Sequence, residues 1–112
     1  KQLSEMNVLF CLSYKGGMEA MGLRNLPFTA GTTIAYGQEY EQAVQSVTLD
    51  AAKILGISNL VGSIEKGKHA SFFISTGDAL DMRTNNIEHA FIKGLSINLD
   101  NHQKRLYEKY KR

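Results

Sequence analysis

Histidine and carboxylate side chains are the groups in this 112-residue chain that could bind a metal ion or transfer protons. The histidines are His69, His89 and His102, and none has a second histidine or a cysteine within four residues along the chain. Zinc sites usually draw their ligands from closely spaced histidines and cysteines. We therefore interpret all three as surface or sheet-edge histidines, and we predict no metal ligand in this chain.

The carboxylates do not suggest a catalytic pair either. Asp78, Asp81 and Glu88 are scattered, whereas acid–base chemistry needs two carboxyl groups held at a defined separation. We interpret them as solvated charges of loops and strand edges. Lys15 precedes Gly16 and Gly17, but the segment lacks the spacing and the Lys-Ser/Thr ending of a phosphate-binding loop. No catalytic residue is predicted within these 112 residues.

The charge distribution argues against a nucleic-acid interface. The formal net charge is +2, and most of the basic excess lies at the end of the chain, in Lys104, Arg105, Lys109, Lys111 and Arg112 against Glu108. The remainder then carries eight basic and ten acidic side chains. Nucleic-acid binding requires clustered Lys and Arg on the folded body. We interpret the basic end as a solvated helix terminus and expect no nucleic-acid partner.

Composition limits the size and the setting of the domain. With 43% hydrophobic residues the chain can form one compact core. It contains no apolar run of about 18 residues that could cross a bilayer. Cys11 is the only cysteine, so no disulfide can form within the chain. We interpret it as a small buried hydrophobic residue, which fits a reducing compartment. We therefore favour a cytoplasmic location for the protein, with a periplasmic location as the alternative.

The first half of the chain predicts one strand followed by helices. Residues 7–13 form a short, nearly continuous apolar run, typical of a strand covered on both faces, as in a parallel sheet or a barrel wall. Gly16 and Gly17 then break the chain. Residues 25–36 predict a helix, with Asn25 as a possible cap, Pro27 in the first turn and Gly37 at the end.

A second helical segment follows at residues 39–55, where apolar residues recur at spacings of three, four or one. The pattern predicts two helices, or one helix bent near Thr48. Gly56 would then take the left-handed conformation that ends the second helix.

The second half predicts short strands and turns. Residues 61–64 and 70–74 are expected to be strands that flank a polar turn at 65–68, in which Gly67 can take a positive φ. Residues 87–92 and 95–97 predict a hairpin that turns at Lys93 and Gly94. Residues 100–111 predict a helix capped by Asp100, with Leu106 and Tyr110 one turn apart.

Several motifs in the middle of the chain resemble one known family. They follow one another at close spacing: Ala43-Val44, then Thr48-Leu49-Asp50-Ala51-Ala52-Lys53-Ile54-Leu55-Gly56-Ile57, then Val61-Gly62-Ser63-Ile64-Glu65-Lys66-Gly67-Lys68-His69-Ala70. The order resembles the C-terminal end of the amidohydrolase superfamily, in its imidazolonepropionase-like and dihydroorotase-like branch. Weaker agreement extends to the run at 8–13 and to the closing strand at 87–94.

The resemblance implies a fold and a division of the chain. It implies an α+β fragment, in which residues 1–57 are the last strand and helices of a (β/α)8 barrel. Residues 58–99 would be strands of the small composite β-sandwich, and residues 100–112 a helical tail. The partner that completes the fold would be the N-terminal part of the same barrel.

The resemblance also implies a chemistry for the intact protein. Members hydrolyse C–N bonds of small molecules, often cyclic amides, with a zinc-like divalent metal at the C-terminal ends of the barrel strands. An Asp after the eighth strand usually handles the proton of the metal-bound water. It would fall near Tyr14 or Lys15, and neither is a carboxylate. Ser13, Tyr14 and Lys15 could still contact substrate from the rim, while the 112 residues alone would be inactive.

Two other functions remain open. The missing carboxylate allows a non-catalytic amidohydrolase-like protein that uses its barrel to bind a ligand. The third alternative is a free-standing α+β module that dimerises through its apolar faces. The apolar run at 8–12 argues against this module, because such a strand needs parallel neighbours. A homo-oligomer formed through exposed apolar faces is compatible with all three.

Overall fold

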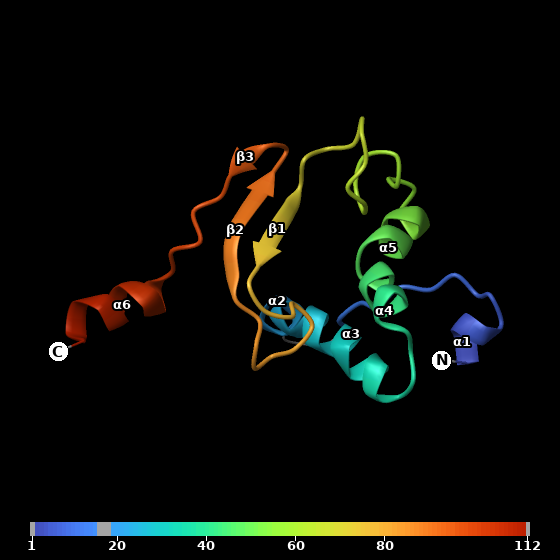
Figure 1. Ribbon diagram of the computed structural model, residues 1–112, viewed down its shortest axis with the longest axis horizontal. Helices are drawn as coiled ribbons and strands as arrows, with labels where there is room; N and C mark the ends of the chain where they lie inside the picture. Colours follow the sequence, from blue (N-terminus) through green and yellow to red (C-terminus); the bar gives the residue numbers. More distant parts are fainter. Residues whose placement is uncertain (1, 16–18, 112) are drawn as a thin grey trace.

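The computed structural model describes residues 2–15 and 19–111. It is an α+β unit in which helices and a three-stranded antiparallel sheet lie side by side (Figure 1). Two short helices, α1 (Gln2–Glu5) and α2 (Glu19–Gly22), precede the main helical part. The expected chain break at Gly16 and Gly17 lies outside the described residues.

The first long helix is α3, Leu26–Ala35, close to its predicted bounds. Pro27 lies in its first turn, and Gly37 follows its end with a φ of 86°, as expected. Asn25 does not cap the helix with its side chain, because a short 3-10 turn, η1 (Leu23–Asn25), leads directly into α3. The prediction of the cap was therefore wrong, although the helix itself is confirmed.

The second helical segment is divided as predicted. Helix α4 covers Tyr40–Ser46 and α5 covers Leu49–Ile54, with the break at Val47 and Thr48. The Thr48 hydroxyl donates to the Val44 carbonyl at 2.8 Å. Gly56 ends the segment in the left-handed conformation with a φ of 72°.

Small side chains form the core between these helices. Ala30 and Ala43 are fully buried and cluster with Leu80, which comes from the loop between the first two strands. Gly31 lies against the same loop: a β-carbon there would be 2.2 Å from the carbonyl oxygen of Leu80. The close packing of α3, α4 and this loop therefore depends on residues with little or no side chain.

The sheet has the order β1-β2-β3, with β1 at Phe72–Ser75, β2 at Ile87–Ile92 and β3 at Leu95–Ser96. Phe72 pairs with Phe91 across β1 and β2, and their ring centroids are 5.0 Å apart. Lys93 and Gly94 both have positive φ in the turn between β2 and β3. The predicted hairpin is confirmed, and β1 matches the strand expected at 70–74.

Two predicted strands do not form. Residues 8–15 have no strand partner, and the backbone of Leu12 instead donates to the Ser46 carbonyl at 3.0 Å. A strand covered on both faces needs neighbouring strands, and none lies beside this run within the described residues. Residues 61–64 form bends rather than a strand, and Gly62 there has a φ of 100°. The turn at 65–68 is present, with Gly67 at a φ of 94°.

The last element is α6, His102–Tyr110, as predicted. Its cap is Asn101 rather than Asp100, since the Asn101 side chain accepts a hydrogen bond from the Lys104 backbone at 2.9 Å. The Asp100 carboxylate is instead 3.4 Å from Arg105 Nε. Asn101 precedes the first helical residue, which is the position from which a side chain reaches the third backbone N–H.

The described chain leaves much apolar surface exposed. Its buried hydrophobic residues are Ala30, Ala43, Ala52 and Leu80, and Cys11 is half-buried rather than buried as expected. The radius of gyration is 16.0 Å, against roughly 13 Å for a compact domain of this length. No helix among the described residues is both long and apolar enough to cross a membrane.

Candidate functional site

The predicted rim residues follow the apolar run at 8–12. Ser13, Tyr14 and Lys15 are all exposed. The Tyr14 ring lies against Gly22 of α2, where a β-carbon would be 2.2 Å from Tyr14 Cε1. This contact fixes the ring beside the start of the helical part, whereas no described contact holds the side chains of Ser13 and Lys15. Their role in substrate contact stays a prediction.

A hollow of about 760 Å³ lies between the apolar run and α3. Leu12, Phe10 and Phe28 contribute apolar walls, and Thr32, Thr33 and Gln38 are among its polar groups. Cys11 and Tyr36 are its titratable lining groups among the described residues, and no carboxylate, lysine, arginine or histidine lines it. Because no carboxylate, lysine or histidine is present to exchange a proton with them, we interpret this hollow as a packing surface rather than a reaction site, and the rim residues do not line it.

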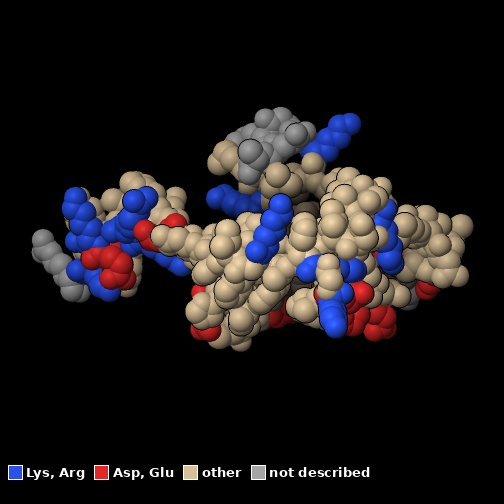
Figure 2. Space-filling view, turned by 90° about the horizontal axis from the view of Figure 1, so that it is seen from above, with Lys and Arg blue, Asp and Glu red and all other residues tan. Residues whose placement is uncertain are grey.

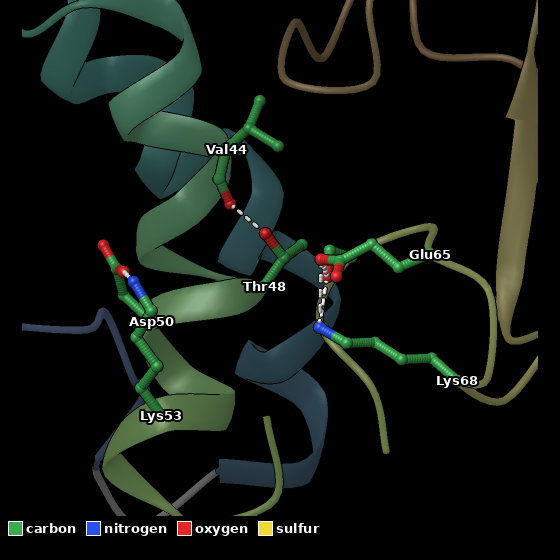
Figure 3. Close-up of polar contacts among 7 residues, drawn as sticks. Val44, Thr48, Asp50, Lys53, Glu65 and Lys68 are labelled. Atoms are coloured by element: carbon green, nitrogen blue, oxygen red, sulfur yellow. Dashed lines mark hydrogen bonds and ion pairs between the residues drawn. The ribbon is translucent and has the colours of Figure 1, made fainter. Parts of the chain in front are cut away.

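The most closely connected polar cluster lies in the turn after α5. Lys68 Nζ donates to Ser63 Oγ at 2.5 Å and to Glu65 Oε1 at 3.1 Å, while Ser63 Oγ donates to Glu65 Oε1 at 2.5 Å. Figure 3 shows Lys68 and Glu65 pointing toward one another in this turn. The hydrogen bond from Ser63, followed by that from Lys68, lowers the pKa of the Glu65 carboxyl below its usual value.

This cluster contains a serine and a lysine, a combination that can form a hydrolytic nucleophile and base. Its hydrogen bonds do not suit that role. The Ser63 proton is directed to Glu65, and the Lys68 ammonium is paired with the same carboxylate. A lysine that serves as the general base must instead be uncharged and accept the serine proton, and the lowered pKa of Glu65 makes its carboxylate a weaker base. We conclude that the cluster stabilises the conformation of the turn. It does so through hydrogen bonds between side chains close together in the chain, as a helix cap does through local hydrogen bonds.

A second polar link joins distant parts of the chain. The Tyr40 hydroxyl, at the start of α4, donates to Asp78 Oδ1 at 2.8 Å. The same oxygen accepts the Leu80 backbone N–H at 2.8 Å. The hydrogen bond to Asp78 is the main reason that the pKa of Tyr40 is raised above its ordinary value. This link holds the loop that carries Leu80 against the helices.

Neither polar cluster was identified in the sequence. The Ser63, Glu65 and Lys68 cluster has a local signal, a serine and a lysine on either side of a glutamate within six residues. Tyr40 and Asp78 are 38 residues apart, and no local pattern predicts their contact.

The histidines do not form a metal site. His69 lies half-buried in the turn after α5, His89 is exposed in β2, and His102 is exposed at the start of α6. Among the described residues, no group of three or more His, Cys, Asp or Glu side chains could hold a metal ion. A divalent metal of the kind found in hydrolases needs at least three such ligands. The described residues therefore do not fit a metal centre.

Comparison with known proteins identifies relatives of this chain. A segment of 32 residues is 62% identical to an imidazolonepropionase of Shewanella frigidimarina, and covers 29% of this chain and 8% of that protein. A segment of 57 residues is 42% identical to an imidazolonepropionase of Erwinia tasmaniensis, and covers 51% of this chain and 14% of that protein. The chain thus matches only a small part of the length of these curated relatives.

A solved structure and a family model extend the similarity to most of the chain. The crystal structure of an amidohydrolase from Thermotoga maritima superposes with a TM-score of 0.75 at 30% identity, over 87% of this chain and 24% of that one. The model of the amidohydrolase family matches residues 5–97. The match includes helices α2 to α5, the Ser63 to Lys68 turn and all three strands, and the chain belongs to the amidohydrolase family.

Proposed function

We propose that this chain is the C-terminal portion of a metal-dependent amidohydrolase that hydrolyses a C–N bond in a small cyclic amide. Residues 1–57 would complete a (β/α)8 barrel, and residues 58–99 would contribute strands to the β-sandwich beside it. The 112 residues alone are inactive, because the groups that hold the metal lie elsewhere in the intact protein. The imidazolonepropionase relatives support a substrate with an amide bond inside a ring.

The observation that carries the proposal is the extent of the structural match. The chain superposes over 87% of its own length but on only 24% of the Thermotoga amidohydrolase. The apolar surface supports the same interpretation, since Val8 and Leu9 are 44% and 51% exposed in a run that would suit a buried strand. Neighbouring strands of a barrel would cover these side chains and pair with their backbone.

The contribution of this chain to the reaction would lie at the rim. A bound divalent metal would supply a water of lowered pKa and polarise the amide carbonyl. Ser13, Tyr14 and Lys15 would contact the substrate from the end of the apolar run, with the Tyr14 ring held in place by its contact with Gly22. These residues would therefore affect substrate binding more than metal content.

The test compares the intact protein with residues 1–112. We expect the intact protein to contain a divalent metal, to hydrolyse cyclic amides such as imidazolones, hydantoins or dihydropyrimidines, and to lose activity on chelation. Residues 1–112 should hold no stoichiometric metal by elemental analysis. One tightly bound ion per 112-residue chain would contradict the proposal.

Variants of the intact protein test the rim. Tyr14→Phe and Lys15→Ala should raise KM with the metal content unchanged, and Lys66→Ala, an exposed change in the turn after α5, is the matched control. A change in metal content in the rim variants, or an equal effect of the control, would remove the rim from the proposal.

A non-catalytic binding protein is the second candidate, and one observation favours it. No carboxylate occupies positions 13–15, where the family usually places the Asp that handles the proton. A protein of this kind would bind a cyclic amide without consuming it. Equilibrium binding of the intact, metal-loaded protein, with no product after prolonged incubation, would favour this candidate over the enzyme.

A further inference from the structure

Helix α6 stands away from the rest of the chain. Every described residue from 101 to 111 is exposed. Figures 1 and 2 both show the helix at one end of the molecule, beyond an extended segment that separates it from its own body. The helix also lies outside residues 5–97, which match the family model. An isolated helix of nine residues is marginally stable in water, so α6 needs a surface to pack against.

One side of α6 is suited to such packing. At about 100° per residue, Leu106, Tyr110 and Tyr107 fall within one arc of the helix. They are 41%, 68% and 68% exposed. Lys109 follows at one edge of this apolar arc and Lys104 at the other. Gln103 falls inside the same arc, so the helix presents a strip of one leucine, two tyrosines and one amide, bordered by a cation on each side.

The two bordering cations are available for a partner. Among the described residues, the ammonium groups of Lys104 and Lys109 have no carboxylate within ion-pair distance. Lys109 lies 5.1 Å from the centre of the Tyr110 ring. Arg105 and Lys111, by contrast, are paired with Asp100 and Glu108. Figure 2 shows Lys and Arg gathered at this end of the molecule.

A hollow with the complementary character lies between α3 and the loop after β1. It measures about 580 Å³, and its lining combines apolar side chains, Phe28, Ile34, Leu80 and Met82, with the carboxylates of Asp78 and Asp81. The Met82 side chain is exposed. Arg83 also lines the hollow, and its side chain is 91% exposed with Nε 3.7 Å from Asp81 Oδ1. This long contact leaves Asp81 accessible to a second cation.

We propose that α6 of one copy docks in this hollow of a second copy. Leu106 and Tyr110 contact the apolar lining, and Lys104 and Lys109 lie near Asp78 and Asp81. Reciprocal exchange of the two helices closes a twofold dimer, because each copy supplies one helix and one hollow. The carboxylates and apolar lining of the hollow complement the cations and apolar side chains of α6. An anionic membrane is a poorer partner, because one leucine and two tyrosines give a short helix little apolar area to insert into lipid.

Cysteine cross-linking of the intact protein tests the contact directly. In a background without other cysteines, one preparation carries Met82→Cys and another carries Tyr110→Cys. Mixing them under mild oxidation should give a disulfide-linked dimer, while Lys66→Cys in place of Tyr110→Cys should give none. Absence of the mixed dimer overturns the proposal. So does a disulfide that forms only within one chain carrying both substitutions, because α6 would then occupy its own hollow.

Sedimentation equilibrium tests the charges. Lys104→Glu with Lys109→Glu should raise the dimer dissociation constant about tenfold or more, and Lys66→Glu should leave it unchanged. Circular dichroism verifies that each variant is folded. A monomer at all concentrations, or an unchanged dissociation constant, overturns the proposal. Binding of a monomer to phosphatidylglycerol vesicles through α6 would assign the helix to a membrane surface instead.

Discussion

The helical part and the sheet of this chain bury their residues to different degrees. Between the helices, Ala30 and Ala43 are fully buried. In the sheet, Phe73, Ile74 and Ile92 are 53%, 47% and 57% exposed. The helices meet through small, buried alanines, whereas the sheet presents large apolar side chains to its surroundings.

The helical part and the sheet therefore depend on different contacts for their stability. Packing between α3, α4 and the loop that carries Leu80 is completed by residues of this chain, so substitutions there should act on its own folding. The sheet has a single described ring contact, between Phe72 and Phe91. Its large exposed side chains gain most from surfaces that the described chain does not provide. The predictions below test this contrast in the intact protein.

The largest expected effect is that of Gly62→Ala. Gly62 has a φ of 100°, and a β-carbon there would lie 2.8 Å from the Ala52 β-carbon. Backbone strain and overpacking together should lower the free energy of unfolding by about 3 kcal/mol. Gly56→Ala is the matched control, because Gly56 has a φ of 72° with open space around it. It should lose only about 1 kcal/mol. Equal urea midpoints for the two variants would contradict close packing at Gly62.

An intermediate effect is expected in the sheet. Phe72→Ala removes a half-buried ring that packs on Phe91 and should lower the free energy of unfolding by about 2 kcal/mol. Phe73→Ala, on the other face, should cost less than about 1 kcal/mol, because the Phe73 side chain is 53% exposed. Thermal unfolding measures both. A larger loss for Phe73→Ala would show that another part of the intact protein covers this face.

A smaller effect is expected at α6. Asn101→Ala removes the side chain that caps the helix and should destabilise α6 by about 1 kcal/mol. Asp100→Ala, which leaves the cap in place, should have less effect on the helix. Hydrogen exchange at residues 104–110 measures the difference. Exchange that changes more in Asp100→Ala than in Asn101→Ala would restore Asp100 as the cap.

The smallest effect concerns the turn at 63–68 and depends on pH. The folded-state pKa of Glu65 lies below its usual value of 4.5. Its carboxylate therefore stabilises the fold above that pH, and the contribution disappears as the pH falls through the folded-state pKa. The melting temperature of Glu65→Gln should be slightly below that of the parent at neutral pH and should converge with it once the pH falls below the folded-state pKa of Glu65. Glu88→Gln, in the exposed part of β2, is the matched control for the removal of a carboxylate.

Helices and turns could be predicted from the sequence where the residues that specify them lie close together in the chain. The helices at 26–35, 40–46 and 49–54 follow from apolar spacing, and Gly37 and Gly56 end their segments because a glycine takes a positive φ without strain. The hairpin at Lys93 and Gly94 follows from the same property. The strand expected at 7–13 does not form within the described chain for a different reason: an apolar run indicates a segment suited to burial, and a strand also requires a paired neighbour.

The candidate site was less predictable than the fold. Ser13, Tyr14 and Lys15 were selected by resemblance, and their place beside the helical part became visible only through the contact of Tyr14 with Gly22. The polar cluster of Ser63, Glu65 and Lys68 was overlooked, although all three residues lie in a motif that supported the family resemblance.

The amino-acid sequence by itself determined the family, the helical segments, the glycine turns and the closing hairpin, because each depends on residue types at short separation. The tertiary structure alone decided that Tyr40 bonds to Asp78 and that Gly31 lies against Leu80. It also decided that α6 stands clear of the body. Contacts of this kind join residues far apart in the chain, where no local spacing constrains which side chains meet, so only the folded backbone brings them together.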